Sequence, residues 1–132
     1  MDTSAEYIEM CTKSDSLQNI LREWDDGDFL AYHNEYGYER EADVAFICDS
    51  DPYYQRPDPK CKVRPTWLPR QDQLQEIVIG RVFDSAQDLM RWAYSFLDTI
   101  YQQYPYNSIE QFWLMFIMKE KFNKEWNGSE WK

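Results

Sequence analysis

The sequence predicts an α+β fold: an N-terminal helix, a small antiparallel sheet of two to three strands, and three further helices, the last of them buried. Apolar residues recur at three- and four-residue steps in four segments, which is the spacing of one helix face. Two short runs rich in aromatic and aliphatic residues, DFLAYH and DVAFIC, follow the first of these segments and predict strands. Proline and glycine lie between these segments, where they separate one element from the next.

The first helix is expected over residues 4–24, with Thr3 or Ser4 as its N-cap. Its apolar face would be formed by Tyr7, Cys11, Leu17, Ile20, Leu21 and Trp24. Gly27, in the acidic turn DDGD at 25–28, suits the left-handed position that commonly ends a helix.

Two antiparallel strands are expected at 28–33 and 43–48, joined by a long turn. Between residues 49 and 65, four prolines predict a long loop, because proline can neither donate to a sheet ladder nor continue a helix. So long a loop is unusual in a compact domain and is a candidate for function. Residues 66–68 are expected to form a third strand or an extended arm held by Trp67 in the core.

Pro69 fixes the backbone at the entrance of a helix expected over residues 70–79, which Gly80 would stop. Its inward residues would be Leu74, Ile77 and Val78. The next helix is expected over 85–103, with Asp84 as its N-cap. Its apolar stripe would contain Leu89, Met90, Ala93, Phe96, Leu97, Ile100 and Tyr104.

The last helix is expected over residues 109–124, where Ser108 and Gln111 have the spacing of a capping box. Its segment FWLMFIM, residues 112–118, is apolar on every side and is therefore expected to be buried. The features expected after it are a stop at Asn127–Gly128 and a final anchor at Trp131.

The composition is that of one intracellular domain. The length of 132 residues suits a single domain, 1–132, and the aromatic content of 17% favours a packed core. Three cysteines far apart in sequence fit a reducing compartment better than a disulfide framework. The acidic N-terminus resembles no signal peptide, and the longest apolar run is too short to cross a bilayer. We therefore expect a soluble cytoplasmic protein that does not enter the membrane.

The negative charge is confined to the first half of the chain. Residues 1–60 hold 15 Asp and Glu against 5 Lys and Arg, which accounts for the whole net charge of −10, whereas residues 61–132 hold 9 of each. An acidic half disfavours direct nucleic-acid binding, which depends on Lys and Arg contacting phosphates. It favours a partner with a basic surface. The alternative is that these residues only keep a Trp-rich chain in solution.

Three stretches resemble a family of small phage and prophage proteins of low-G+C Gram-positive bacteria. They are EYIEMC at 6–11, WLPRQDQLQEI at 67–77 and SIEQFWLMFIMKEKFNKEWNGSEW at 108–131. The resemblance implies a protein of an infected or lysogenic bacterium. It implies no mechanism, because the family has no established activity. Residues 34–65 depart most from the pattern, as a variable acidic and proline-rich insert, and are the segment where a specialised role is expected.

The sequence lacks a recognisable catalytic or cofactor motif. His33 is the only histidine, so a triad would need it together with Cys48 or Cys11, and a strand-end histidine is the simpler reading. The cysteines lack the paired spacing of zinc sites. The acidic turns at 25–28 and 49–51 lack the pattern of a calcium loop. Four unpaired glycines cannot form a phosphate loop, so we expect no cofactor, no metal and no catalytic residue.

The favoured hypothesis is a phage-encoded, non-enzymatic interaction protein that binds a basic host protein, as an inhibitor of a defence or nucleic-acid-handling protein. Its partner-binding residues would be Asp49, Asp51, Asp58, Tyr36, Tyr38, Tyr53 and Tyr54.

The alternative hypothesis is a small-ligand protein that binds or sequesters a nucleotide signal, with an aromatic side chain on the base and cations on the phosphate. The cations would be Arg56, Lys62 and Arg64. Such pockets commonly form between subunits, so a homo-oligomer would favour this alternative. An enzyme with an unrecognised carboxylate site is the third.

Overall fold

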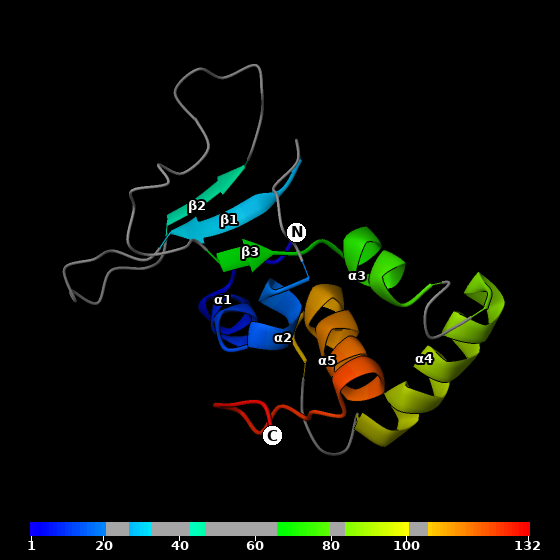
Figure 1. Cartoon of the computed structure of the whole chain (residues 1–132). Helices are drawn as coiled ribbons and strands as arrows, with labels where there is room; N and C mark the ends of the chain where they lie inside the picture. The colour runs from blue at the N-terminus through cyan, green and yellow to red at the C-terminus, as the bar shows by residue number, and fades with distance from the viewer. Residues whose placement is uncertain (21–26, 33–42, 47–65, 80–83, 101–105) are drawn as a thin grey trace. The chain divides into compact units, whose positions relative to one another are not determined.

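The computed structural model describes residues 1–20, 27–32, 43–46, 66–79, 84–100 and 106–132. The elements gather into two compact units, one formed by Thr3–Pro69 and the other by Met1–Asp2 with Arg70–Lys132. The first unit holds the sheet and the second holds the later helices, which confirms the predicted α+β class (Figure 1). The single-domain organisation stays a prediction.

The first predicted helix is two helices, α1 (Ala5–Thr12) and α2 (Asp15–Gln18). Of the two candidate N-caps, Ser4 is the one used, since its hydroxyl accepts a hydrogen bond from the Tyr7 N–H at 3.2 Å. The single helix predicted over 4–24 is wrong because Ser14 interrupts it. The Ser14 hydroxyl donates to the Cys11 carbonyl at 2.7 Å and so competes with the helical hydrogen bonds. Residues 21–24 lie outside the described ranges.

The sheet contains β1 (Phe29–Tyr32), β2 (Asp43–Phe46) and β3 (Thr66–Leu68) in the order β2-β1-β3, all antiparallel. Leu30 lies opposite Ala45 on one side and Trp67 on the other. The two predicted strands are confirmed, although residues 33, 47 and 48 of the predicted segments lie outside the described ranges. The third segment is a strand rather than an arm. Gly27 has a positive φ of 90°, two residues before β1 begins. Its predicted role as the end of a helix involves residues 21–26, which lie outside the described ranges.

The outer edge of β3 is held by side chains from α1 and α2. The Gln18 amide accepts a hydrogen bond from the Trp67 N–H at 2.8 Å and donates to the Trp67 carbonyl at 2.9 Å, as a neighbouring strand would. The Tyr7 hydroxyl donates to the Pro69 carbonyl at 2.6 Å. The Thr12 and Thr66 hydroxyls lie 3.1 Å apart. The two Gln18 hydrogen bonds satisfy backbone groups of Trp67 that would otherwise leave an open strand edge.

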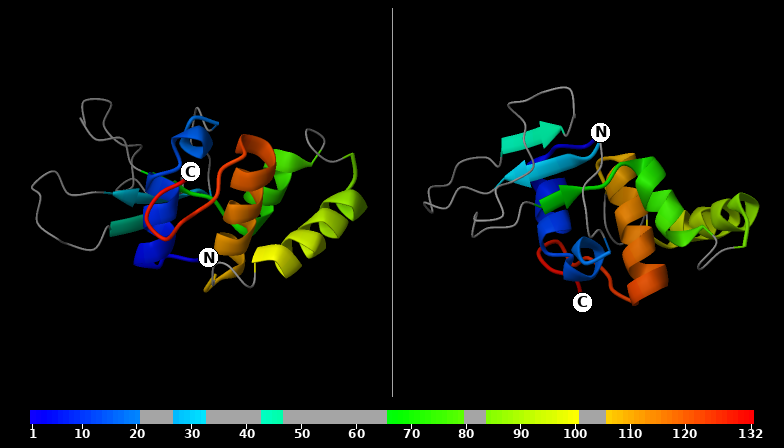
Figure 2. Two further views of the ribbon diagram at one scale, coloured as in Figure 1. Left: turned by 90° about the horizontal axis from the view of Figure 1, so that it is seen from below. Right: turned by 45° about the horizontal axis from the view of Figure 1, so that its top comes forward.

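In the second unit, α3 (Gln71–Val78) packs along α5 (Ile109–Phe122), as Figure 2 shows from two sides. The predicted inward residues of α3 are buried: Leu74, Ile77 and Val78. Every residue from Phe112 to Met118 in α5 is buried, as the all-apolar segment predicts.

The start of α5 differs from the predicted capping box. The Ser108 hydroxyl accepts from the Gln111 N–H at 3.1 Å, as expected. The side-chain oxygen Oε1 of Gln111, however, accepts from the backbone N–H of Asn107 at 2.9 Å rather than from that of Ser108. Its amide nitrogen donates to the Asp2 carboxylate at 3.0 Å, so Asp2 completes the cap.

Helix α4 (Ala86–Ile100) begins later than predicted. Its N-cap is Ser85 and not Asp84, because the Ser85 hydroxyl accepts from the Asp88 N–H at 3.2 Å. Of the predicted stripe, Leu89 and Ala93 are buried, whereas Met90 is 57% exposed, which contradicts its predicted place in the core.

The Asn127–Gly128 pair does not end α5. The helix ends at Asn123, which is left-handed with φ 53°. Asn127 and Gly128 form instead a turn that brings the ends of the following segment together, with the Glu125 N–H donating to the Lys132 carbonyl at 2.7 Å. The rings of Trp126 and Trp131 lie 5.1 Å apart, which confirms that Trp131 folds back.

Candidate interaction surface

The residues predicted to bind a partner or a ligand all lie outside the described ranges. They are Tyr36, Tyr38, Asp49, Asp51, Tyr53, Tyr54 and Asp58, and, for the ligand alternative, Arg56, Lys62 and Arg64. Both hypotheses about these residues therefore stay predictions. His33, Cys48 and Cys61 also lie outside, while Cys11 is a buried free thiol in α1.

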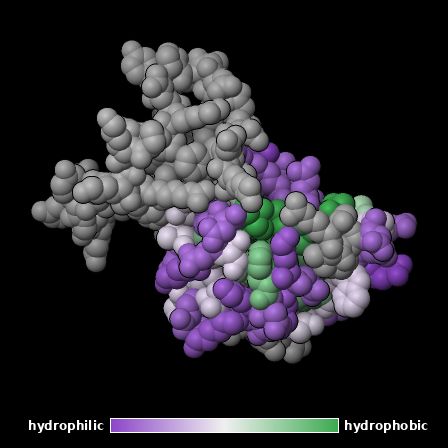
Figure 3. Space-filling model, in the orientation of Figure 1, coloured by the Kyte–Doolittle hydropathy of each residue, from purple (hydrophilic) through white to green (hydrophobic). Residues whose placement is uncertain are grey.

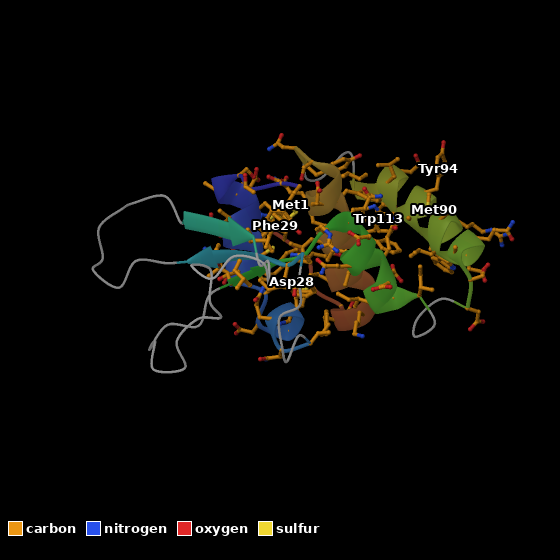
Figure 4. All side chains as sticks on the ribbon, turned by 90° about the horizontal axis from the view of Figure 1, so that it is seen from above. Met1, Asp28, Phe29, Met90, Tyr94 and Trp113 are labelled. Carbon is orange, nitrogen blue, oxygen red and sulfur yellow. The ribbon has the colours of Figure 1, made fainter. Side chains whose placement is uncertain are left out.

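The described part of the chain contains no group of three His, Cys, Asp or Glu side chains that could hold a metal ion. Of the three aspartates in the acidic turn at 25–28, only Asp28 is described, and its side chain is buried directly before β1 (Figure 4).

Three described acidic residues of the sheet unit lie on the surface of its two helices. Glu6 and Glu9 are exposed on α1, and Asp15 is exposed at the start of α2. Glu9 forms an ion pair with Lys13 at 2.5 Å, one helical turn away. These carboxylates contribute to the negative charge of the first half of the chain.

In the second unit, Asp72 is the described carboxyl with a shifted pKa. The Arg70 guanidinium donates two hydrogen bonds of 3.0 Å to the two oxygens of this carboxylate. These bonds hold the pKa of Asp72 below its usual value of 3.8. The Asp72 side chain is 69% exposed, so the pair lies at the surface of α3.

The most prominent exposed apolar side chains in the described ranges lie on α4. Met90 is 57% exposed, Trp92 is 56% exposed and Tyr94 is 72% exposed. Met90 and Tyr94 lie one helical turn apart (Figure 4). On the adjoining face of the helix, Leu89 and Ala93 are buried, and Phe96 packs edge-on against Phe116 of α5 with ring centroids 5.3 Å apart. The apolar arc of α4 is therefore wider than the face that packs within the unit.

This exposed face is missed when the sequence is read as one helical stripe. That stripe assigns Met90 to the core because Ala93 and Leu97 follow it at steps of three and four residues. The sequence feature that could have located the exposed face is the width of the apolar surface of the helix. Met90 and Tyr94 extend this surface well beyond Leu89 and Ala93. A helix that packs on one side alone cannot bury so wide an arc.

Figure 3 shows that hydrophilic residues cover most of the described surface seen from its side of the molecule. No helix in the described ranges is long and apolar enough to cross a membrane. Comparisons of the chain with family models, with curated proteins and with solved structures find no match. Any function assigned to this chain therefore rests on its own residues.

Proposed function

We propose that the chain is a phage-encoded interaction protein without catalytic activity, which binds a host protein through its acidic first half. The observation that carries the proposal is the separation of charge, with 15 acidic against 5 basic residues in positions 1–60 and 9 against 9 in positions 61–132. A chain that needed charge only for solubility would gain nothing from confining it to one half.

A basic partner surface fits this charge distribution. Opposite charges steer the encounter of two proteins and raise the association rate, most strongly at low salt. Residues 34–65 combine carboxylates with tyrosines, and tyrosine supplies large contact areas at protein interfaces. The exposed carboxylates of Glu6, Glu9 and Asp15 would extend the same negative field.

The negative charge of the first half also suggests what kind of host protein is bound. Proteins that handle nucleic acids present basic grooves to phosphates. An acidic protein seated in such a groove would compete with the nucleic acid. The proposed role is therefore the inhibition of a defence or nucleic-acid-handling protein of the host.

The first experiment is capture from host lysate. The purified chain is immobilised, lysate is applied at low salt, and bound proteins are eluted with rising salt and identified by mass spectrometry. We expect one stoichiometric basic protein, released by salt because screening weakens attraction between exposed charges. If nothing is retained, the proposal fails and the small-ligand alternative is tested by thermal shift with nucleotides.

A matched pair of variants tests where the partner binds. In the first, Asp49, Asp51 and Asp58 are changed to Lys; in the second, the exposed residues Glu76, Glu120 and Glu130 are changed to Lys. Both make the same change in net charge, but only the first makes it in the acidic half. We expect the first to lower affinity for the captured protein by about tenfold or more and the second to leave it nearly unchanged. Equal affinities for both variants would contradict the proposed location.

A further inference from the structure

The face of α4 that carries Met90 and Tyr94 continues as a regular seam along the helix. Gln87, Met90, Tyr94 and Leu97 are spaced by three, four and three residues, which is the repeat of two helices that pack side by side. Gln87 is exposed and Leu97 is half-buried. The seam therefore borders the packed face of Leu89 and Ala93 without being part of it.

Charges beside this seam indicate what covers it. Arg91 and Asp98 each follow a seam residue, Met90 and Leu97, and both are exposed. They are seven residues apart, about 10 Å along the axis, which is too far for an ion pair within one helix. Among the described residues, no ion pair involves either of them. A partner helix that pairs with both must present an acid and a base in the reverse order.

We infer that two copies of this chain associate through α4, with the two helices antiparallel across a two-fold axis. When the second helix is reversed and the two-fold axis passes between residues 95 and 96, Arg91 of each copy lies beside Asp98 of the other, so the symmetry forms the same ion pair twice. In this register Tyr94 of each copy packs against Leu97 of the other at the centre of the contact, while Gln87 and Met90 lie toward its two ends.

A parallel arrangement would not pair these charges. There, Arg91 and Asp98 would face the positions that directly precede seam residues, Ala86 and Ala93, and neither of these carries a charge. The even charge balance of residues 61–132 also allows two copies to approach here, whereas the acidic half would repel its own copy. The charge pattern thus selects both a second copy and its direction.

An interface of this length is small. Helix α4 has 15 residues, so the contact belongs at the low end of specific interfaces, below about 1,200 Å² in total. We therefore expect a dissociation constant on the order of micromolar or weaker. This inference does not rest on the proposed host partner, since it concerns the purified chain alone.

The test is sedimentation equilibrium of the purified chain up to about 500 µM, well above a micromolar dissociation constant. We expect a monomer–dimer equilibrium that Tyr94→Lys abolishes. Ser95→Lys is the matched control, because it puts the same charge on the same helix away from the seam. Far-UV circular dichroism checks that each variant is folded.

The charge swap tests the antiparallel pairing. Arg91→Glu and Asp98→Arg should each weaken the dimer by about tenfold or more, since each turns two attractions into two repulsions. The variant that carries both substitutions should restore dimerisation, because the two charges are then exchanged and attract each other again across the interface. A monomer at every concentration, a dimer that survives Tyr94→Lys, or a double variant that is no better than the single ones would each overturn the inference.

Discussion

At the residue scale, the Arg70–Asp72 pair is the most specific electrostatic feature described. Both guanidinium hydrogen bonds reach the carboxylate at 3.0 Å, yet the Asp72 side chain is 69% exposed. Water screens such a pair, so its contribution to the free energy of unfolding is small, below about 0.5 kcal/mol.

This pair makes stability depend on pH in a defined direction. The pKa of Asp72 is lower in the folded chain than its usual 3.8, so its contribution is present above 3.8 and is lost as the pH falls through the lowered value. We expect carboxyl NMR titration to find this lowered pKa and Arg70→Gln to move it back toward 3.8. An unchanged pKa in that variant would show that Arg70 is not its cause.

Residue-level predictions from the sequence succeeded where one candidate was chemically unambiguous. Ser108 is correctly predicted as a cap because Gln111 follows it at the spacing of a capping box, directly before the apolar segment 112–118. The prediction of Asp84 as the N-cap of α4 is wrong, because the neighbouring Ser85, a residue type that also caps helices, is the one used. Asp2 could not be predicted as the partner of Gln111, because 109 residues separate them in the sequence.

At the element scale, the smallest strand depends on side chains distant in the sequence. The Gln18 amide satisfies both the N–H and the carbonyl of Trp67 at the edge of β3. Gln18→Ala would leave both backbone groups without that partner, so we expect it to lower the free energy of unfolding by about 1–3 kcal/mol.

Urea unfolding measures this loss. Gln75→Ala on α3 is the matched control, because Gln75 is half-buried like Gln18 but its side chain makes no hydrogen bond in the described part of the chain. The control should change stability by less than about 0.5 kcal/mol. Equal stability of the two variants would show that Gln18 does not hold the strand edge.

The types and order of the elements were predictable from periodicity, but their ends were not. The later helices were found within a few residues because their apolar repeats are long. The break between α1 and α2 was missed because the apolar repeat continues through it. It is a local competition between the Ser14 hydroxyl and the helical hydrogen bonds, which periodicity does not report.

At the scale of the whole molecule, the single-domain prediction is testable by unfolding. The described elements form two compact units, 3–69 and 1–2 with 70–132, and each contains buried tryptophan. If the chain is one domain, far-UV circular dichroism and tryptophan fluorescence should report the same urea midpoint. Two separated midpoints would contradict the prediction.

The candidate surfaces were predictable to different extents. The acidic half is a property of composition and is read directly from the sequence. The exposed face of α4 was not predictable from the sequence. Burial of Met90 depends on which side of the helix packs against α5, and the apolar repeat alone does not determine that side.

The proposed function depends on where the negative charge lies, so the most direct test is the salt dependence of binding to the captured host protein. The dissociation constant is measured against salt concentration for the natural chain and for the two triple variants. The proposal predicts a steep dependence that flattens in the variant of Asp49, Asp51 and Asp58 and persists in the variant of Glu76, Glu120 and Glu130. The same slope in all three proteins would contradict it.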